Sequence, residues 1–138
     1  MSNTRSPINY KGRSIGIITL TIAQSLIGAI HVFSGLWLLT AGSLADLISA
    51  QSSPIYSVYT LIFGLLTVVF ASGIWLGKSW GWIGTIVISM FVIAADALTL
   101  LSLPSIPGIP KSAAAAEIAY SLIVILYLSH PRVRKKYK

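Results

Sequence analysis

Three ionisable side chains, His31, Asp96 and Glu117, stand inside long apolar segments of the sequence. If these segments are helices, a rise of about 1.5 Å per residue places all three roughly 20–26 Å from the same membrane surface. Tyr59 falls at a similar depth in a fourth segment. An imidazole and two carboxylates at one depth could relay protons, bind a cation or hold a divalent metal. The sequence therefore predicts a polar cluster of these four residues in the outer half of a membrane domain.

Two structural explanations compete with a functional site. Glu117 lies near the first turn of its segment, where the helix dipole and interfacial water stabilise a carboxylate. Asp96 and His31 could pair as a contact between helices, because a charge inside a membrane needs a partner or water. With one histidine at this depth and no metal-binding spacing, the sequence does not decide whether the cluster binds a metal, and no cofactor is expected.

The elements that carry these residues follow from the scarcity of charge. Between Ser14 and His130 the formally charged residues are Asp46, Lys78, Asp96, Lys111 and Glu117. Four apolar stretches, at about 15–41, 55–77, 79–103 and 112–130, each meet the roughly 20 residues that a spanning helix needs. The first is too long for the 7–15-residue core that is typical of a signal peptide. We therefore expect an all-α, four-helix membrane bundle that forms one domain over residues 1–138.

The distribution of positive charge predicts the orientation. Nine of the ten Lys and Arg residues fall on one side if both termini share it, and only Lys111 falls on the other. Under the positive-inside rule, both termini are cytoplasmic and the protein belongs in the cell membrane. The basic tail should anchor on anionic lipid headgroups through Arg132, Arg134, Lys135 and Lys136. Nucleic acid is not an expected partner, since the charge flanks membrane spans.

Each apolar segment carries one face of small and polar residues at helical spacing. Membrane helices associate through close approach at small residues and through hydrogen bonds, so these faces should point inward. The expected packing glycines are Gly28, Gly35, Gly64, Gly73 and Gly77. The inward face of the last segment is predicted to contain Ala113, Glu117, Tyr120 and Ser121.

The hairpin from Gly73 to Trp82 has a Gly-x-x-x-Gly-basic-x-Trp-Gly pattern, and His130-Pro131 precedes a charged tail. Over roughly residues 55–138, this arrangement resembles small prokaryotic tetraspan membrane proteins of unknown function. An archaeal source would suit the isoleucine-rich spans and basic ends. The resemblance implies a four-helix membrane fold and no particular activity.

No nucleotide-binding loop, zincin helix or nucleophile elbow occurs, and cysteine is absent. The first hypothesis is a non-enzymatic accessory or structural subunit of a larger membrane complex, with membrane-protein partners or as a homo-oligomer. The alternative is a small proton, ion or solute transporter that uses the polar cluster, and a metal-dependent membrane enzyme is a third. Space for water beside the cluster would favour transport.

Overall fold

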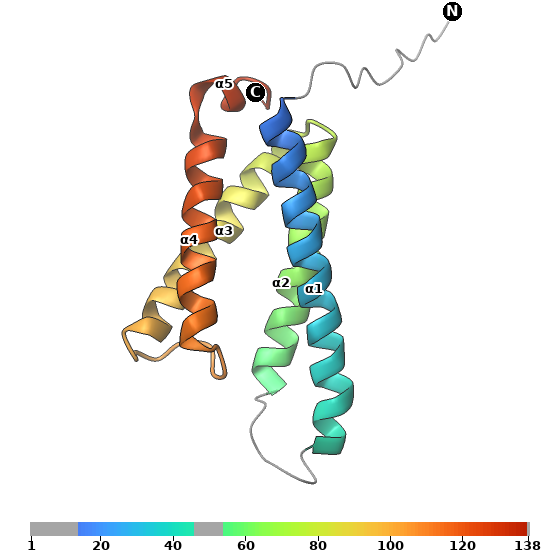
Figure 1. The fold of residues 1–138 in the computed structure, drawn as a ribbon, viewed down its shortest axis with the longest axis vertical. Coiled ribbons are helices and arrows are strands. Elements are labelled where there is room, and N and C mark those ends of the chain that lie inside the picture. The colour runs from blue at the N-terminus through green and yellow to red at the C-terminus, as the bar shows by residue number, and fades with distance from the viewer. Residues whose placement is uncertain (1–13, 46–53, 138) are drawn as a thin grey trace, which may run out of the picture.

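The computed structural model describes residues 14–45 and 54–137, and within them every regular element is a helix. The helices are α1 (Ile15–Ala45), α2 (Pro54–Trp75), α3 (Ser79–Leu100), α4 (Lys111–Ser129) and α5 (Pro131–Arg134) (Figure 1). Helices α1 to α4 are long and apolar enough to cross a membrane. The predicted all-helical architecture, with four helices long and apolar enough for a multi-pass membrane protein, is therefore confirmed in the described residues.

The turn between α2 and α3 is built around Gly77. Its φ of +69° lies in the left-handed region, which favours glycine. The Lys78 amide donates to the Gly73 carbonyl at 2.9 Å, which closes the last turn of α2. A Cβ atom on Gly77 would meet no atom within 4 Å. Gly77 is therefore a turn residue, and the prediction that it packs against another helix is wrong.

Helix α3 ends at Leu100, three residues before the expected boundary. Ser102 adopts a φ of 58°, and its amide donates to the Thr99 carbonyl at 3.1 Å. The prolines at 104, 107 and 110 follow, and they lack the amide hydrogens that a helix requires. The polypeptide therefore leaves the helix before the first of these prolines.

Helices α1 and α2 make the closest helix pair. A Cβ atom on Gly64 would lie 2.6 Å from the Val32 nitrogen, and one on Gly35 would lie 2.7 Å from the Leu61 nitrogen. A Cβ atom on Gly28 would lie 2.9 Å from the Gly64 carbonyl oxygen. Because the neighbouring atoms belong to backbone, these three glycines let the two helices approach directly.

Helix α2 meets α3 in the same manner near the turn. A Cβ atom on Gly73 would lie 2.7 Å from the Gly81 Cα atom. Two further glycines make room for aromatic rings: Gly16 faces the Tyr127 ring and Gly84 faces the Phe70 ring. Backbone contact therefore joins α2 to both α1 and α3.

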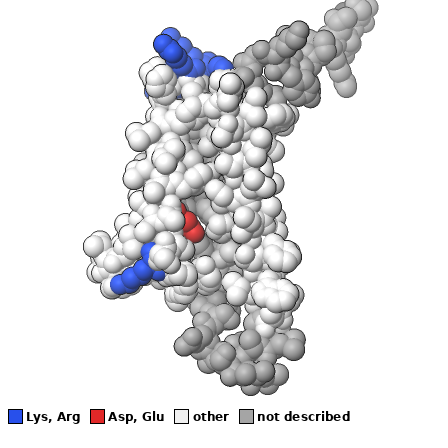
Figure 2. Space-filling view, in the orientation of Figure 1, with Lys and Arg blue, Asp and Glu red and all other residues white. Residues whose placement is uncertain are grey.

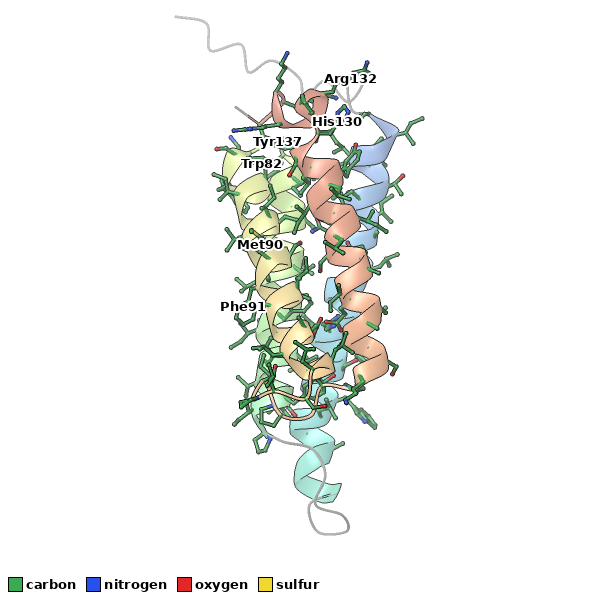
Figure 3. The ribbon with its side chains drawn as sticks, turned by 90° about the vertical axis from the view of Figure 1, so that its left-hand side faces the viewer. Trp82, Met90, Phe91, His130, Arg132 and Tyr137 are labelled. Atoms are coloured by element: carbon green, nitrogen blue, oxygen red, sulfur yellow. The ribbon has the colours of Figure 1, made fainter. Side chains whose placement is uncertain are left out.

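The small and polar faces point inward, as predicted. The buried residues of α2 are Ser57, Thr60, Gly64, Thr67, Ala71, Gly73 and Ile74. In α4 the fully buried alanine is Ala114 and not the expected Ala113. Large side chains such as Met90 and Phe91 are exposed and point away from the bundle (Figure 3). This outer surface suits contact with lipid chains.

An apolar cluster closes the end of the bundle where the described chain begins and ends. This terminal plug consists of Ile17, Leu20, Ile74, Val124, Leu128, Val133 and Tyr137. The Trp82 ring nitrogen donates to the Leu128 carbonyl at 3.0 Å, and the Tyr137 hydroxyl donates to the Ile74 carbonyl at 3.3 Å. Figure 3 shows Trp82, His130, Arg132 and Tyr137 at this end. The plug thus fixes the C-terminal segment against α2.

Candidate binding site among the four helices

A cavity of about 260 Å³ lies beside the terminal plug, and all four long helices line it. Its polar lining comes from Gln24 and His31 of α1, Thr67 of α2, Ser89 of α3, and Glu117, Tyr120 and Ser121 of α4. Ile27, Phe63, Ile88 and Val92 form apolar walls between these groups. The inward faces of the helices therefore enclose a space as well as making contacts.

His31 and Glu117 are brought together in this cavity. His31 Nδ1 lies 2.8 Å from the Ile27 carbonyl oxygen, and it must donate there because a carbonyl only accepts. His31 Nε2 lies 3.6 Å from Glu117 Oε1. If the ring is neutral, Nε2 carries a lone pair that repels an ionised Glu117 carboxylate. The two side chains attract each other only when a proton is bound to Nε2 or to the carboxylate. The pair is therefore a place where a proton can be held.

Asp96 lies close to this pair, but it is more deeply enclosed. Its side chain is 0% exposed, and it is near enough to Glu117 for their charges to interact. No hydrogen bond of normal geometry reaches either carboxylate oxygen from the described residues. The expected pairing of Asp96 with His31 is wrong, because the carboxylate partner of His31 is Glu117.

Tyr59 stands at the edge of the cluster and does not line the cavity. Its ring stacks on Phe63 with centroids 6.0 Å apart, and it also contacts Phe91 at 6.4 Å. Phe63 in turn meets the His31 ring edge-on at 4.9 Å. Tyr59 is thus linked to the histidine through an aromatic contact.

Two polar residues of the cavity are absent from the cluster predicted from the sequence. Gln24 is 2% exposed, and its Oε1 has no hydrogen-bond partner in the described part of the chain. The buried Tyr120 hydroxyl likewise has no hydrogen-bond partner in the described part of the chain. Both residues lie on the small and polar faces predicted for their segments, and this position is the sequence signal that could have identified them as cavity residues. Their uncharged side chains kept them out of a cluster defined by ionisable groups at one depth.

A metal site is not supported in the part of the chain that the structure describes. No group of three or more His, Cys, Asp or Glu side chains there could hold a metal ion. His31 faces Glu117, whereas Asp96 approaches the pair from a separate, enclosed position on α3. The three residues that could have held a divalent cation are therefore not arranged to do so.

The cavity opens along the seam between α1 and α4. Close backbone packing joins α1 to α2, α2 to α3 and α3 to α4, whereas α4 hardly approaches α1. At the terminal end the hydroxyls of Ser14 and Tyr127 are 3.3 Å apart, so side chains bridge the seam there. Figure 2 shows acidic atoms recessed in a hollow on this face. Side-chain exposure of 21% for His31 and 29% for Glu117 makes both accessible from this opening.

No protein-family model matches this chain, and comparisons with curated proteins and with solved structures find no similar protein. The chemistry of the site itself is therefore the guide to its function.

Proposed function

We propose that this protein is a small membrane carrier that takes up and releases a proton at His31, Glu117 and Asp96. The observation that carries the proposal is the partly open cavity lined by all four helices, with the His31–Glu117 pair on its wall. Ionisable groups inside a membrane domain mark ion and proton pathways by default. A purely structural contact would not need a cavity beside it.

The chemistry follows from the protonation of the pair. The Ile27 carbonyl keeps a proton on His31 Nδ1, so the exchangeable proton lies between Nε2 and Glu117. Asp96 is a second carboxylate beside Glu117 and offers the proton another acceptor. A proton that enters from the seam can therefore pass between two carboxylates.

The terminal plug gives the carrier a closed side. Its apolar side chains separate the cavity from the end of the bundle that holds α5. A carrier that exposes a central site alternately to two sides needs such a barrier on one side at a time. The described conformation supports a state that is open at the seam and closed at the plug.

The test is proton flux in vesicles that contain the purified protein. With an imposed membrane potential and a pH-sensitive dye inside, the wild type should move protons faster than empty vesicles. Asp96→Asn should abolish this flux, because an amide cannot take up and release a proton. Ser72→Ala is the matched control: Ser72 is exposed, and its hydroxyl donates to the Val69 carbonyl of its own helix at 2.6 Å.

Wild-type flux no greater than that of empty vesicles would overturn the proposal. The accessory-subunit hypothesis would then remain, and co-purification of the native protein with other membrane chains would test it. An unchanged flux in Asp96→Asn would remove Asp96 from the proton route.

The orientation with both termini in the cytoplasm belongs to the same proposal. The basic residues of the C-terminal segment gather at one end of the molecule, and Lys111 lies at the other (Figure 2). Arg132, Arg134, Lys135 and Lys136 are all exposed there, which supports their contact with anionic headgroups. Arg5, Lys11 and Arg13 lie outside the described residues. Under the positive-inside rule, this end faces the cytoplasm of the cell.

Labelling of single cysteines tests the orientation. The chain has no cysteine, and Pro107 and Lys136 are exposed at opposite ends of the bundle. In intact cells, a membrane-impermeant thiol reagent should label Pro107→Cys and leave Lys136→Cys unlabelled until the cells are opened. The reverse pattern would place the basic end outside.

A further inference from the structure

We infer that the cavity binds a small organic ammonium ion with an apolar body, and this inference rests on the proposed carrier function by naming its co-substrate. The ligand would place its N–H groups against Glu117 and Gln24. Its apolar body would lie against the hydrophobic walls.

The first argument is the balance of hydrogen-bonding groups. Gln24 and Tyr120 line the cavity with buried polar atoms that have no partner among the described residues, and Gln24 Oε1 can only accept. The carboxylate of Glu117 lines the same cavity from α4. A buried acceptor without a partner is unfavourable, so a ligand that donates a hydrogen bond to it removes that cost on binding. An ammonium group donates three hydrogen bonds and accepts none. The unpaired Gln24 oxygen is an observation independent of the acidic residues, and it also favours a ligand that donates hydrogen bonds.

The second argument is charge. Glu117 pairs with the His31 imidazole and lies near the Asp96 carboxylate, while Lys78 and Lys111 lie at the helix ends. Lys111 already donates to the Ser102 hydroxyl at 2.8 Å. With both carboxylates ionised, one positive charge is needed beyond that of His31. An anion in the cavity would be repelled by the Glu117 carboxylate on its lining and by Asp96 close behind it.

The third argument is the apolar surface of the cavity. Apolar atoms make up most of the cavity lining, and Ile27, Phe63, Ile88 and Val92 contribute to it, so a hydrated inorganic ion would lose water there without compensation. Phe63 and Tyr120 add aromatic rings, whose faces attract organic cations. An aryl or alkyl group on the ammonium nitrogen fits these walls.

The fourth argument is the route of entry. The seam between α1 and α4 has little backbone packing, and the exposed Ala116 presents only a methyl group beside the cavity. In a spanning bundle this seam faces the lipid, so the bilayer itself can deliver an amphiphilic amine to Glu117. A fully water-soluble ion would have no such route.

Binding of the ammonium group should compete with the proton of the His31–Glu117 pair. The titratable groups around Glu117 are His31 from α1, Tyr59 from α2, Asp96 from α3 and Tyr120 from α4. Uptake of a cation beside Glu117 favours the ionised carboxylate, and the displaced proton leaves to solvent. This exchange would couple the organic cation to proton flux.

The experiment uses the full-length protein in lipid nanodiscs and equilibrium dialysis, with empty nanodiscs as the background. The probe is 2-phenylethylammonium. Propylbenzene is the neutral analogue of the same shape, and 3-phenylpropionate is the anionic one. The wild type should retain the ammonium above background, and it should retain neither analogue. Because a hydrogen bond to a charged carboxylate is stronger than one to a neutral amide, Glu117→Gln should weaken binding about tenfold or more.

Gln24→Leu, which keeps the volume and removes the acceptor, should also weaken binding about tenfold. Ser72→Ala should bind like the wild type. Equal retention of propylbenzene, or preference for 3-phenylpropionate, would overturn the inference. A protein that moves protons but does not bind the ammonium ion would also overturn the inference, and the carrier proposal would then survive. Ammonium binding without any proton flux would instead retain the site and refute the carrier.

Discussion

Gly64→Leu is expected to separate α1 from α2 and to prevent the bundle from assembling stably. Even a Cβ atom on Gly64 would lie 2.6 Å from the Val32 nitrogen and 2.7 Å from the Gly28 carbonyl oxygen. Backbone cannot rotate away as a side-chain end can, so the cost should reach or exceed the roughly 1–3 kcal/mol that is typical of overpacking. Thermal unfolding in mild detergent, followed by size-exclusion chromatography, measures this loss.

The matched control is Ala29→Leu, which adds a similar bulk to an exposed position of α1. That variant should unfold at the wild-type temperature, because its new side chain extends toward detergent or lipid. If Gly64→Leu were as stable as Ala29→Leu, the direct contact between the two helix backbones would be wrong.

Asp96→Asn is expected to stabilise the protein while it removes function. Asp96 is 0% exposed, and no described residue gives its carboxylate a hydrogen bond of normal geometry. A buried carboxylate without hydrogen bonds is costly to ionise, and an amide of the same shape avoids most of this cost. The midpoint of thermal unfolding in detergent should therefore rise, in the same preparation that loses proton flux.

Glu117→Gln provides the comparison for this gain. Glu117 is 29% exposed on its side chain and pairs with His31 at 3.6 Å, so its charge is partly compensated. Its replacement should give a smaller gain or a small loss. A fall in stability for Asp96→Asn would show that the carboxylate has a stabilising partner and would weaken its proposed role as a proton acceptor.

The helical architecture was predictable because membrane insertion imposes simple rules. Long uncharged segments must be helices in lipid, and small residues must face other helices. Gly28, Gly35 and Gly64 follow these rules, and they lie where α1 and α2 come closest. Gly77 does not follow them, because a glycine near a helix end can serve the turn instead of the interface. Composition alone does not separate those two roles.

The details of the site depended on contacts that helical spacing does not specify. Depth alone placed His31, Asp96 and Glu117 in one layer, but the rotation of each helix about its axis determined that Glu117 is the partner of His31. The sequence also does not predict that α1 leaves the seam beside Ala116 open. Such contacts depend on how whole helices tilt and rotate against one another, which no local pattern records.

The unequal packing of the four helices has a consequence for how the protein responds to its bilayer. Glycine contacts hold α1 on α2, and α3 and α4 pack closely, while the two pairs are joined by the contact of α2 with α3 and by the short turn at residues 76–78. The seam between α1 and α4 can therefore widen without separating either pair. Lateral pressure from the lipid chains acts directly on that seam, so bilayer composition becomes one of the factors that determine how far the cavity opens.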